Sequence, residues 1–372
     1  MEFLPNKTRQ AVLEVNLSAV LHNYQYFKSL VKDSTKFVMV IKAFAYGAGI
    51  RNVAKLFENE KVEYLAVACI DEGIELKDAG IEHRIIIFNP ELDGLQKLIE
   101  YGLEPTIYDF ESLSNFLTAL KTFRSYHKPY PVHIKLDTGM HRLGFTQEQL
   151  PDLLKILLDA EPIKVKSVFS HLVGSDNEKF DIYSKSQITM FSDMALNLSV
   201  VLGYPIFRHI LNSSGIQRFP EAQFEMVRLG IGLYGMSSNN VNLENVYSWK
   251  TQISQLKTIK KGESVSYNRS WIAKRDSVIA TLFIGYGDGL NRGLGNEKWS
   301  MKLNGKLVPI VGDICMDLCM VDVTDVNPTI GDELIIFDSQ EEIYRMAKIL
   351  KTIHYEVLTN ISKRVKRVYI QD

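Results

Sequence analysis

TKFVMVIKAFAYGAGI, residues 35–50, is the segment that says most about the fold of this chain. Its apolar run from Phe37 to Ile41 contains β-branched residues and predicts a buried strand that ends at Lys42. A lysine at the end of a buried strand is costly to desolvate, and such a place can lower the pKa of the amine until it acts as a nucleophile. A lysine that reaches solvent along its aliphatic stem would give the same pattern, so both interpretations stay open for this segment alone.

Apolar runs of the same kind recur along the chain up to about residue 235. Amphipathic helical stretches separate most of them, for example at 71–81, 92–102 and 186–203. Strands that alternate with helices predict a parallel sheet, and eight such units predict a closed barrel. An open doubly wound sheet is the alternative, although the chain lacks its glycine fingerprint. The eight predicted strands are FVMVIKA (37–43), YLAVA (64–68), RIIIF (84–88), EPTIY (104–108), VHIKLD (132–137), VKSVFSH (165–171), FRHILN (207–212) and EMVRLGIG (225–232).

The pattern changes after about residue 240 to strands joined by short turns, one of them at Asn304-Gly305. One helix near 340–352 and a final strand, RVKRVYI, follow. This predicts a mostly-β second part. We therefore predict two domains, residues 1–240 and 241–372, and residues 1–16 could pack with the second because AVLEVN at 11–16 reads as a strand.

The composition is that of an ordinary globular protein and excludes several classes of function. The chain has 372 residues, of which 46% are hydrophobic and 23% charged, and its net charge of −1 gives no signature for nucleic acid or anionic membrane. Cys69, Cys315 and Cys319 form neither a disulfide framework nor a zinc-binding spacing, so no metal is predicted, and the last two are expected to be buried thiols. No apolar run has the length of a membrane span, and MEFLPNKTRQ lacks the apolar core of a signal peptide, so we expect a cytoplasmic protein.

An ordered set of short motifs extends over nearly the whole chain. VIKAFAYGAGI and HIKLDTGMHRLGF (133–145) are the first of them. The others are SVFSH ending at His171, HILNSSG (209–215), MVRLGIGLYG (226–235), SVSYNRSW (264–271), IGYGDG (284–289) and VGDICMDLCMVDVT (311–324). In this order the motifs closely resemble the alanine racemase family, which depends on pyridoxal 5'-phosphate (PLP). The resemblance implies an N-terminal (β/α)8 TIM-type barrel with a C-terminal mostly-β domain. It also implies an isomerase that interconverts L- and D-alanine and supplies D-alanine for peptidoglycan synthesis.

The resemblance assigns the proton chemistry to two residues. A racemase removes the α-proton from one face of the substrate and returns one to the other, so two acid/base groups are needed. Lys42, which would also hold PLP covalently, and Tyr267 match these two bases. His171 would hydrogen-bond Tyr267 and connect onward to Arg228, whose guanidinium would face the pyridine nitrogen. A guanidinium does not exchange protons with that nitrogen, which favours racemisation over the decarboxylation seen where a carboxylate stands there.

Four further matches concern the phosphate of PLP. Phosphate binding needs backbone N–H donors near a glycine-rich turn and hydroxyl groups. Ser213, Gly230 and Ile231 match the phosphate-binding residues of the family, and Tyr46 adds a hydroxyl. The LGIG sequence would by itself also fit a tight turn.

The substrate carboxylate and the oligomeric state form the last group of implications. Arg142 matches an arginine that contacts the PLP phenolate oxygen and the substrate carboxylate, and Met316 matches a backbone N–H donor to that carboxylate. Lys135 matches a lysine that is often carbamylated; an ion pair between Lys135 and a nearby acid is the alternative. Because Tyr267 and Met316 of family members reach the site of the neighbouring subunit, the resemblance implies a homodimer with shared active sites.

Two rivals and several departures stay open at this point. A serine or broad-specificity small amino-acid racemase would share every motif, because an apolar wall rejects one extra hydroxyl poorly. A non-enzymatic PLP-binding protein would resemble the barrel but lack the β domain. Phe44, Ala48, Gly287 and Lys363 replace the Asn, His, Ala and Tyr that are usual in the family, which leaves the shape of the entrance and the substrate range undecided.

Overall fold

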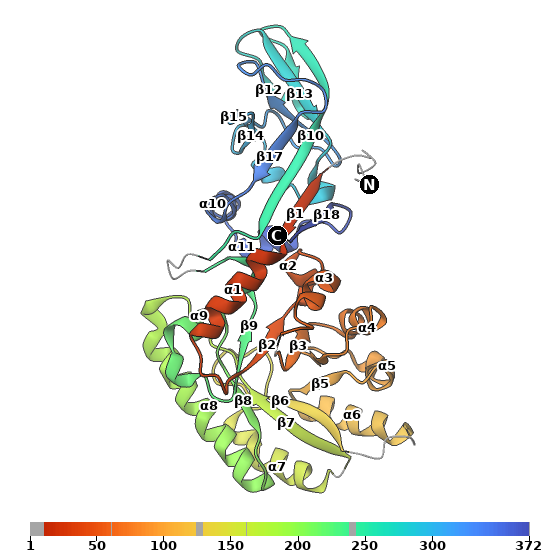
Figure 1. Ribbon diagram of the computed structural model, residues 1–372, viewed down its shortest axis with the longest axis vertical. Helices are drawn as coiled ribbons and strands as arrows, with labels where there is room; N and C mark the ends of the chain where they lie inside the picture. The colour runs from red at the N-terminus through yellow and green to blue at the C-terminus, as the bar shows by residue number, and fades with distance from the viewer. Residues whose placement is uncertain (1–10, 61, 124–128, 161, 238–242, 372) are drawn as a thin grey trace.

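The computed structural model describes residues 11–60, 62–123, 129–160, 162–237 and 243–371. A barrel that carries most of the helices forms one end of the elongated molecule, and a mostly-β part with two helices at its base forms the other (Figure 1). The predicted boundary at residues 240/241 and the N-terminal segment MEFLPNKTRQ lie outside the described residues.

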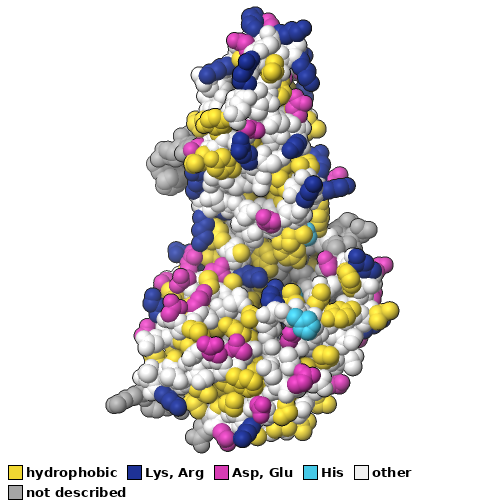
Figure 2. Space-filling view, turned by 180° about the vertical axis from the view of Figure 1, so that it is seen from behind, with side chains coloured by type: hydrophobic (Ala, Val, Ile, Leu, Met, Phe, Trp, Pro, Cys, Tyr) yellow, Lys and Arg dark blue, Asp and Glu magenta, His cyan; other side chains and the backbone are white. Residues whose placement is uncertain are grey.

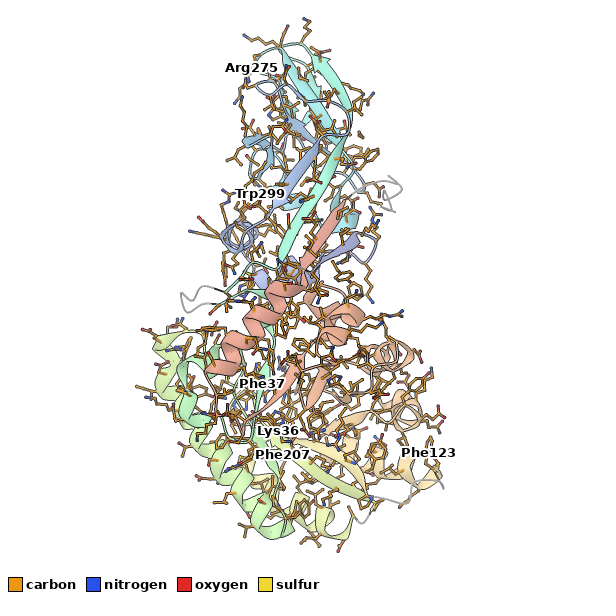
Figure 3. All side chains as sticks on the ribbon, in the orientation of Figure 1. Lys36, Phe37, Phe123, Phe207, Arg275 and Trp299 are labelled. Carbon is orange, nitrogen blue, oxygen red and sulfur yellow. The ribbon has the colours of Figure 1, made fainter. Side chains whose placement is uncertain are left out.

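Eight parallel strands make up the barrel, in the order β8-β7-β6-β5-β4-β3-β2-β9. The first and last strands of this order share no ladder, but the Arg228 N–H donates to the Leu211 carbonyl just beyond β8 at 3.0 Å. At the other end of the barrel, Lys36 of β2 lies 5.1 Å from the centre of the Phe207 ring of β8 (Figure 3). The barrel prediction is confirmed as a nearly closed sheet. Its strands are β2 (Lys36–Val40), β3 (Tyr64–Val67), β4 (Arg84–Ile87), β5 (Glu104–Ile107), β6 (Tyr130–Lys135), β7 (Ile163–Phe169), β8 (Phe207–His209) and β9 (Met226–Leu229).

Helices surround these strands because each presents an apolar stripe at helical spacing. On α7, Leu150, Leu153, Leu154 and Leu157 are buried and the intervening side chains are polar or more exposed. Within the described residues, no helix is long and apolar enough to cross a membrane. The helices around the barrel are α1 (Leu17–Ser29), α3 (Ile50–Leu56), α4 (Ile70–Asp78), α5 (Leu95–Glu100), α6 (Phe110–Thr122), α7 (Leu150–Asp159), α8 (Asp181–Leu202) and α9 (Ser213–Arg218).

The first strand is shorter than predicted, and a left-handed turn takes its place. β2 ends at Val40, and Lys42 begins α2 (Lys42–Tyr46), in which the four residues from Ala43 to Tyr46 have φ between 51 and 56°. Left-handed backbone costs about 1–2 kcal/mol per residue for side chains with a Cβ. Apolar patterning does not reveal such a turn, because Ala, Phe and Tyr have no preference for it.

The Glu72 carboxylate stabilises this left-handed turn. It accepts a hydrogen bond from the Phe44 N–H at 3.3 Å and another from the Ala68 N–H, just after β3, at 2.9 Å. These two bonds tie the turn that carries Lys42 to the neighbouring strand.

Replacing Glu72 by alanine is expected to lower the free energy of unfolding by about 2 kcal/mol, because hydrogen bonds to charged groups contribute about 1.5–3 kcal/mol. Urea denaturation would measure this. The matched control is Glu75→Ala, three residues further along the same helix, which loses only the exposed ion pair with Arg51 and should cost below about 1 kcal/mol. Equal losses in both variants would contradict a special role for Glu72.

The second sheet contains β1, which lies between β10 and β18. β1 pairs antiparallel with β10 and parallel with β18, so the start of the described chain lies in this sheet and not in the barrel. The predicted turn at Asn304-Gly305 is confirmed, with φ of 49 and 76°. The strands are β1 (Val12–Asn16), β10 (Tyr247–Ile259), β13 (Ser277–Leu282), β14 (Ser300–Leu303), β15 (Lys306–Pro309), β16 (Cys319–Asp322), β17 (Glu333–Phe337) and β18 (Lys366–Ile370).

Two helices, α10 (Gln340–Leu350) and α11 (His354–Thr359), connect β17 to β18. The first of them was predicted and the second was not. The core of this part includes Trp299, whose Nε1–H donates to the Ile336 carbonyl at 3.0 Å (Figure 3). Cys319 is buried as predicted, but Cys315 is only half-buried, because it lies in the turn before β16.

Candidate active site

A cavity of about 390 Å³ opens at the carboxyl ends of the barrel strands. Barrel enzymes place their sites there, because the loops after the strands converge at that end. Tyr355 and Thr359 of α11 also line the cavity, so the second part of the molecule contributes to its wall. Nine residues predicted from the sequence meet in it: Lys42, Tyr46, Lys135, Arg142, His171, Ser213, Arg228, Gly230 and Ile231.

Lys42 lies in surroundings that favour its neutral amine. Burial lowers the pKa of Lys42, and the nearby guanidinium of Arg142 lowers this pKa further, while Glu72 acts in the opposite direction. A neutral amine is the form that attacks a carbonyl carbon. The left-handed turn therefore presents a nucleophilic lysine to the cavity.

Lys135, at the end of β6, also lines the cavity. Burial lowers its pKa to about 8, and the charges of Arg142 and Arg228 contribute. Among the described residues, no carboxylate lies within ion-pair distance of Lys135, so the ion-paired alternative is not supported. Four cationic side chains consequently line a cavity that has no acidic side chain among its described lining residues, and such a cavity favours an anionic ligand.

Carbamylation of Lys135 is expected to depend on pH. Because the pKa of Lys135 is lowered to about 8, the neutral amine that reacts with CO2 becomes the main form above that pH and is lost as the pH falls below it. Carbon-13 NMR with labelled bicarbonate should show a carbamate signal that is large at about pH 9 and weak at about pH 6.5. The Lys135→Gln variant is the control, and a signal that persists in it would assign the carbamate to another amine.

Arg228 crosses the floor of the cavity and is only 4% exposed. Its terminal nitrogens donate to the carbonyls of Ser170, His209 and Ile210 at 2.7 to 3.0 Å and contact His209 Nδ1 at 3.0 Å and His171 Nδ1 at 3.3 Å. None of the contacts among the described residues uses its Nε–H, which leaves that donor for a ligand. His171 is therefore joined to Arg228 as predicted, and burial and the Arg228 charge hold the pKa of His171 well below its usual value.

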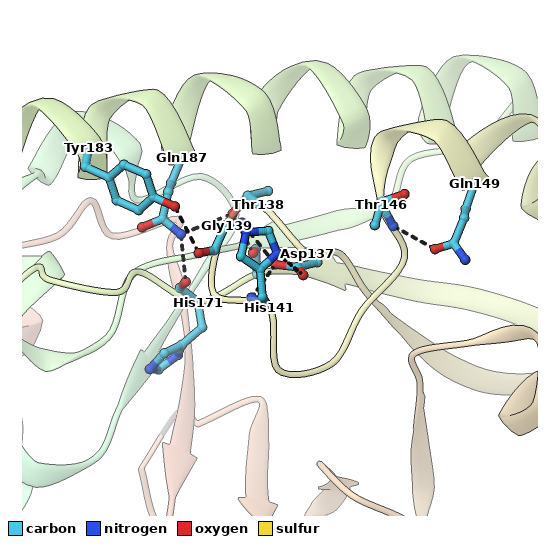
Figure 4. A network of polar contacts seen from close by, with 10 residues as sticks. Asp137, Thr138, Gly139, His141, Thr146, Gln149, His171, Tyr183 and Gln187 are labelled. Atoms are coloured by element: carbon cyan, nitrogen blue, oxygen red, sulfur yellow. Dashed lines mark hydrogen bonds and ion pairs between the residues drawn. The ribbon is translucent and has the colours of Figure 1, made fainter.

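The loops that carry Arg142 and His171 are held by polar contacts (Figure 4). The Asp137 carboxylate accepts hydrogen bonds from the N–H groups of Gly139 and His141, both at 3.0 Å, and lies 3.1 Å from His141 Nδ1. From α8, the Gln187 side chain donates to the His171 carbonyl at 3.2 Å. These contacts hold the loop from Asp137 to Arg142, and they tie His171 to the outer helix α8.

Backbone N–H groups converge at the predicted phosphate site. Ser213 Oγ accepts from the N–H of Gly230 at 3.2 Å and from the N–H of Gly232 at 3.1 Å, at the start of η5 (Ile231–Tyr234). A Cβ at position 230 would lie only 2.8 Å from the Tyr46 hydroxyl, so the backbone and this hydroxyl approach each other closely here. Gly232 was not among the predicted residues.

Tyr267 and Met316 do not reach the cavity of their own chain. Both are in the second part of the molecule, and 66% of Tyr267 and 55% of Met316 is exposed. The predicted contact between Tyr267 and His171 is not made within one chain. Sequence reasoning also missed Tyr355 and Thr359, because α11 is a single short helix without a recognisable pattern.

Comparisons with known proteins agree with this arrangement. The family model for the alanine racemase N-terminal domain matches residues 15–238, and that for the C-terminal domain matches residues 246–369. "Alanine racemase 2" of Caldanaerobacter subterraneus subsp. tengcongensis is 38% identical over 98% of this chain and 96% of its own. The structure of the Clostridium difficile 630 enzyme, described as an alanine racemase, superposes with a TM-score of 0.91 at 34% identity and covers 98% of this chain and 97% of its own. A Bartonella henselae structure, described as alanine racemase with covalently bound pyridoxal phosphate, has a TM-score of 0.86 at 29% identity and covers 98% of this chain and 100% of its own.

Proposed function

The chain belongs to the alanine racemase family, and from this premise we propose that Lys42 and Tyr267 are the two bases of its reaction. The reaction of the family is the interconversion of L- and D-alanine, so the protein is an isomerase, and its cofactor is PLP. The observation that carries the residue assignment is the low-pKa Lys42 in a cavity rich in cationic groups.

The described residues fit PLP. The phosphate would be bound by Ser213, the Tyr46 hydroxyl and the N–H groups of Gly230, Ile231 and Gly232, two of which already converge on the Ser213 oxygen. Lys42 would hold the cofactor covalently, and the free Nε–H of Arg228 would donate to the pyridine nitrogen. When bound, PLP withdraws electrons from the substrate and makes its α-proton acidic.

The residues of the chain then have separate tasks. The Lys42 amine takes or returns the proton on one face of the substrate α-carbon, and the Tyr267 hydroxyl does so on the other. Arg142 binds the substrate carboxylate, together with the backbone N–H of Met316. Arg228 can donate a hydrogen bond but does not give up its proton, because a guanidinium is a very weak acid.

We infer a homodimer in which each active site takes Tyr267 and Met316 from the neighbouring subunit. The support is that both residues are exposed and apart from the cavity of their own chain, although the chemistry requires a second base. Figure 2 shows hydrophobic side chains at the narrow waist between the barrel and the second part, as a subunit interface would require.

Three smaller proposals accompany this one. We propose residues 1–240 and 241–372 as the domains, with β1 belonging to the second because of its pairing. We also propose a cytoplasmic location, which the three unpaired cysteines support. The D-alanine product would serve peptidoglycan synthesis.

The test of the function is to incubate the purified protein with each small L-amino acid and separate the enantiomers by chiral chromatography. Alanine should be racemised fastest, and Lys42→Ala should abolish the reaction. Faster racemisation of serine would favour the broader-specificity alternative. No racemisation of any amino acid in the presence of PLP would contradict the proposed function.

A further inference from the structure

A row of buried polar side chains crosses the inside of the barrel beneath the cavity. It joins Glu104, His133, Ser167, His209 and Arg228, which are 5, 0, 0, 0 and 4% exposed. Successive polar atoms lie within hydrogen-bond distance along the whole row. Glu104 Oε2 is 2.9 Å from His133 Nε2, and His133 Nδ1 is 2.6 Å from Ser167 Oγ. Ser167 Oγ is 2.9 Å from His209 Nε2, and His209 Nδ1 is 3.0 Å from Arg228 Nη1.

Strand register brings these five side chains together. They come from five successive strands, β5 to β9, and their places rise from the amino end of the barrel toward the cavity. His133 and Ser167 are paired residues of β6 and β7. Glu104 is two residues before Thr106, the residue paired with His133, and His209 pairs with Phe169, two residues beyond Ser167. Side chains two apart on a strand point to the same face, so the row follows the tilt of the strands.

The groups at the two ends of the row, Arg228 and Glu104, determine which atom donates in every hydrogen bond between them. The Arg228 guanidinium only donates, so His209 Nδ1 must accept and its proton is on Nε2. The Nε2–H of His209 then donates to Ser167 Oγ, and the Ser167 hydroxyl donates to His133 Nδ1. The remaining proton of His133 is on Nε2 and points at the Glu104 carboxylate, which accepts it.

A doubly protonated His133 would leave the Ser167 hydroxyl without an acceptor. If His133 were doubly protonated, its Nδ1–H and the Nε2–H of His209 would both point at Ser167 Oγ. The Ser167 hydroxyl proton would then have no acceptor among the described contacts, and an unpaired buried hydroxyl is costly. Both histidines are therefore neutral and carry their proton on Nε2.

We propose that Glu104, His133 and Ser167 are positioning residues for Arg228. The row holds His209 as an acceptor for the Arg228 guanidinium, and it ends in the Glu104 carboxylate, whose negative charge balances that guanidinium. The effect of this row on racemisation rests on the proposed function, in which Arg228 faces the cofactor ring. The row of hydrogen bonds itself does not depend on that function.

The need for such a balance is clear from the surroundings of Arg228. Burying an unpaired charge is expensive, and no carboxylate among the described residues lies within ion-pair distance of this guanidinium. The ring of His209 is stacked on Phe169, with centres 4.9 Å apart, so the ring does not turn freely. The hydrogen-bonded row thus connects the buried cation to an acid that lies too far away for direct contact.

Other charged groups surround the Glu104 end of the row. Tyr64 packs edge-on against the His133 ring with centres 5.3 Å apart, and Arg84 Nη1 lies 3.5 Å from the Tyr64 hydroxyl. Lys77 of α4 interacts with the charge of Glu104, and its ammonium donates to the His83 carbonyl at 2.7 Å. Neither Arg84 nor Lys77 contacts the Glu104 carboxylate, which leaves His133 as its hydrogen-bond donor in the described residues.

The first experiment observes the protons themselves in the protein without PLP. Nitrogen-15 NMR of histidine-labelled protein reports which ring nitrogen carries the proton, and His133→Gln and His209→Gln assign the signals. Both histidines are expected to give the signals of a neutral ring with the proton on Nε2. An imidazolium, or a proton on Nδ1, at either His133 or His209 would overturn the proposal whether or not the protein is a racemase.

The second experiment tests whether the row acts on Arg228. Glu104→Gln keeps the shape of the side chain and removes its charge. It should raise the Kd of the protein for PLP about tenfold, which corresponds to the free energy of one hydrogen bond to a charged group. In an Arg228→Lys background the same change should alter this Kd less than about twofold, because a lysine cannot maintain the same contact with His209. The kcat for alanine should fall while the KM stays within about twofold, since Arg228 does not contact the substrate carboxylate.

Thr106→Val is the matched control. Thr106 is two residues from Glu104 on the same strand and is completely buried, and its hydroxyl has no hydrogen-bond partner among the described residues. This variant should change the Kd for PLP less than about twofold in either background. Equal effects of Glu104→Gln in the wild-type and Arg228→Lys backgrounds would overturn the coupling. If Glu104→Gln does not fold, Ser167→Ala interrupts the same row and is used in its place.

Discussion

Mixing two inactive variants, Lys42→Ala and Tyr267→Phe, is expected to restore up to about a quarter of the wild-type racemase activity. In the proposed dimer each site combines Lys42 of one subunit with Tyr267 of the partner subunit. Random assortment of equal amounts gives half heterodimers, and each heterodimer has one intact site of two. The measurement is racemisation after subunit exchange, and the exchange is verified with two differently tagged chains. If exchange is complete and the mixture remains inactive, both bases belong to one chain.

This result would follow directly from the placement of the two residues. Lys42 lines the cavity at the carboxyl ends of the barrel strands, whereas 66% of Tyr267 is exposed in the second part of the molecule. A second mixture, Lys42→Ala with Lys42→Met, is the control. It contains no Lys42 in any subunit, so it should remain inactive at every ratio.

Tyr267→Phe by itself is expected to slow racemisation by about 10²- to 10⁴-fold, the usual contribution of a positioned acid or base. The loss should be unequal for the two enantiomers. Removal of the α-proton from L-alanine requires the tyrosine, but Lys42 can still remove and return a proton on its own face of D-alanine. Exchange of deuterium from the solvent into D-alanine should therefore persist in part.

Proton NMR of the alanine α-position in deuterated buffer measures both exchange rates in one sample. Lys42→Ala provides the comparison, because it lacks both the base for D-alanine and the residue that would hold PLP, and it should exchange neither enantiomer efficiently. Equal residual exchange of both enantiomers in Tyr267→Phe would show that the tyrosine does not serve a single face.

The barrel could be predicted from sequence because its strands are short runs of buried β-branched residues between amphipathic helices. RIIIF at 84–88 is the clearest case: β4 covers Arg84–Ile87, and all three isoleucines are fully buried. The left-handed turn after β2 could not be predicted, because Glu72, on which it depends, is remote in sequence from the turn.

The candidate site could also be predicted only in part, because some of its residues lie in recognisable motifs and others do not. Nine residues followed from the resemblance of short motifs, and strand order brings them to one cavity. Tyr355 was missed because it comes from a short helix that is distant in sequence. Glu104, His133 and Ser167 were missed because each looks like an isolated polar residue in an apolar strand, and only the register of three strands shows that they form one row.

The position of β1 between β10 and β18 has a consequence for the order in which the chain acquires its structure during synthesis. Val12 pairs with Lys250, so the ribosome must add 238 residues after Val12 before this pair can form. At about 5–20 residues per second this is a wait of roughly 12 to 48 seconds, during which the whole barrel is synthesised. We expect the strand that precedes the barrel to remain unpaired until β10 is made, and to lack its second neighbour, β18, until translation is nearly finished.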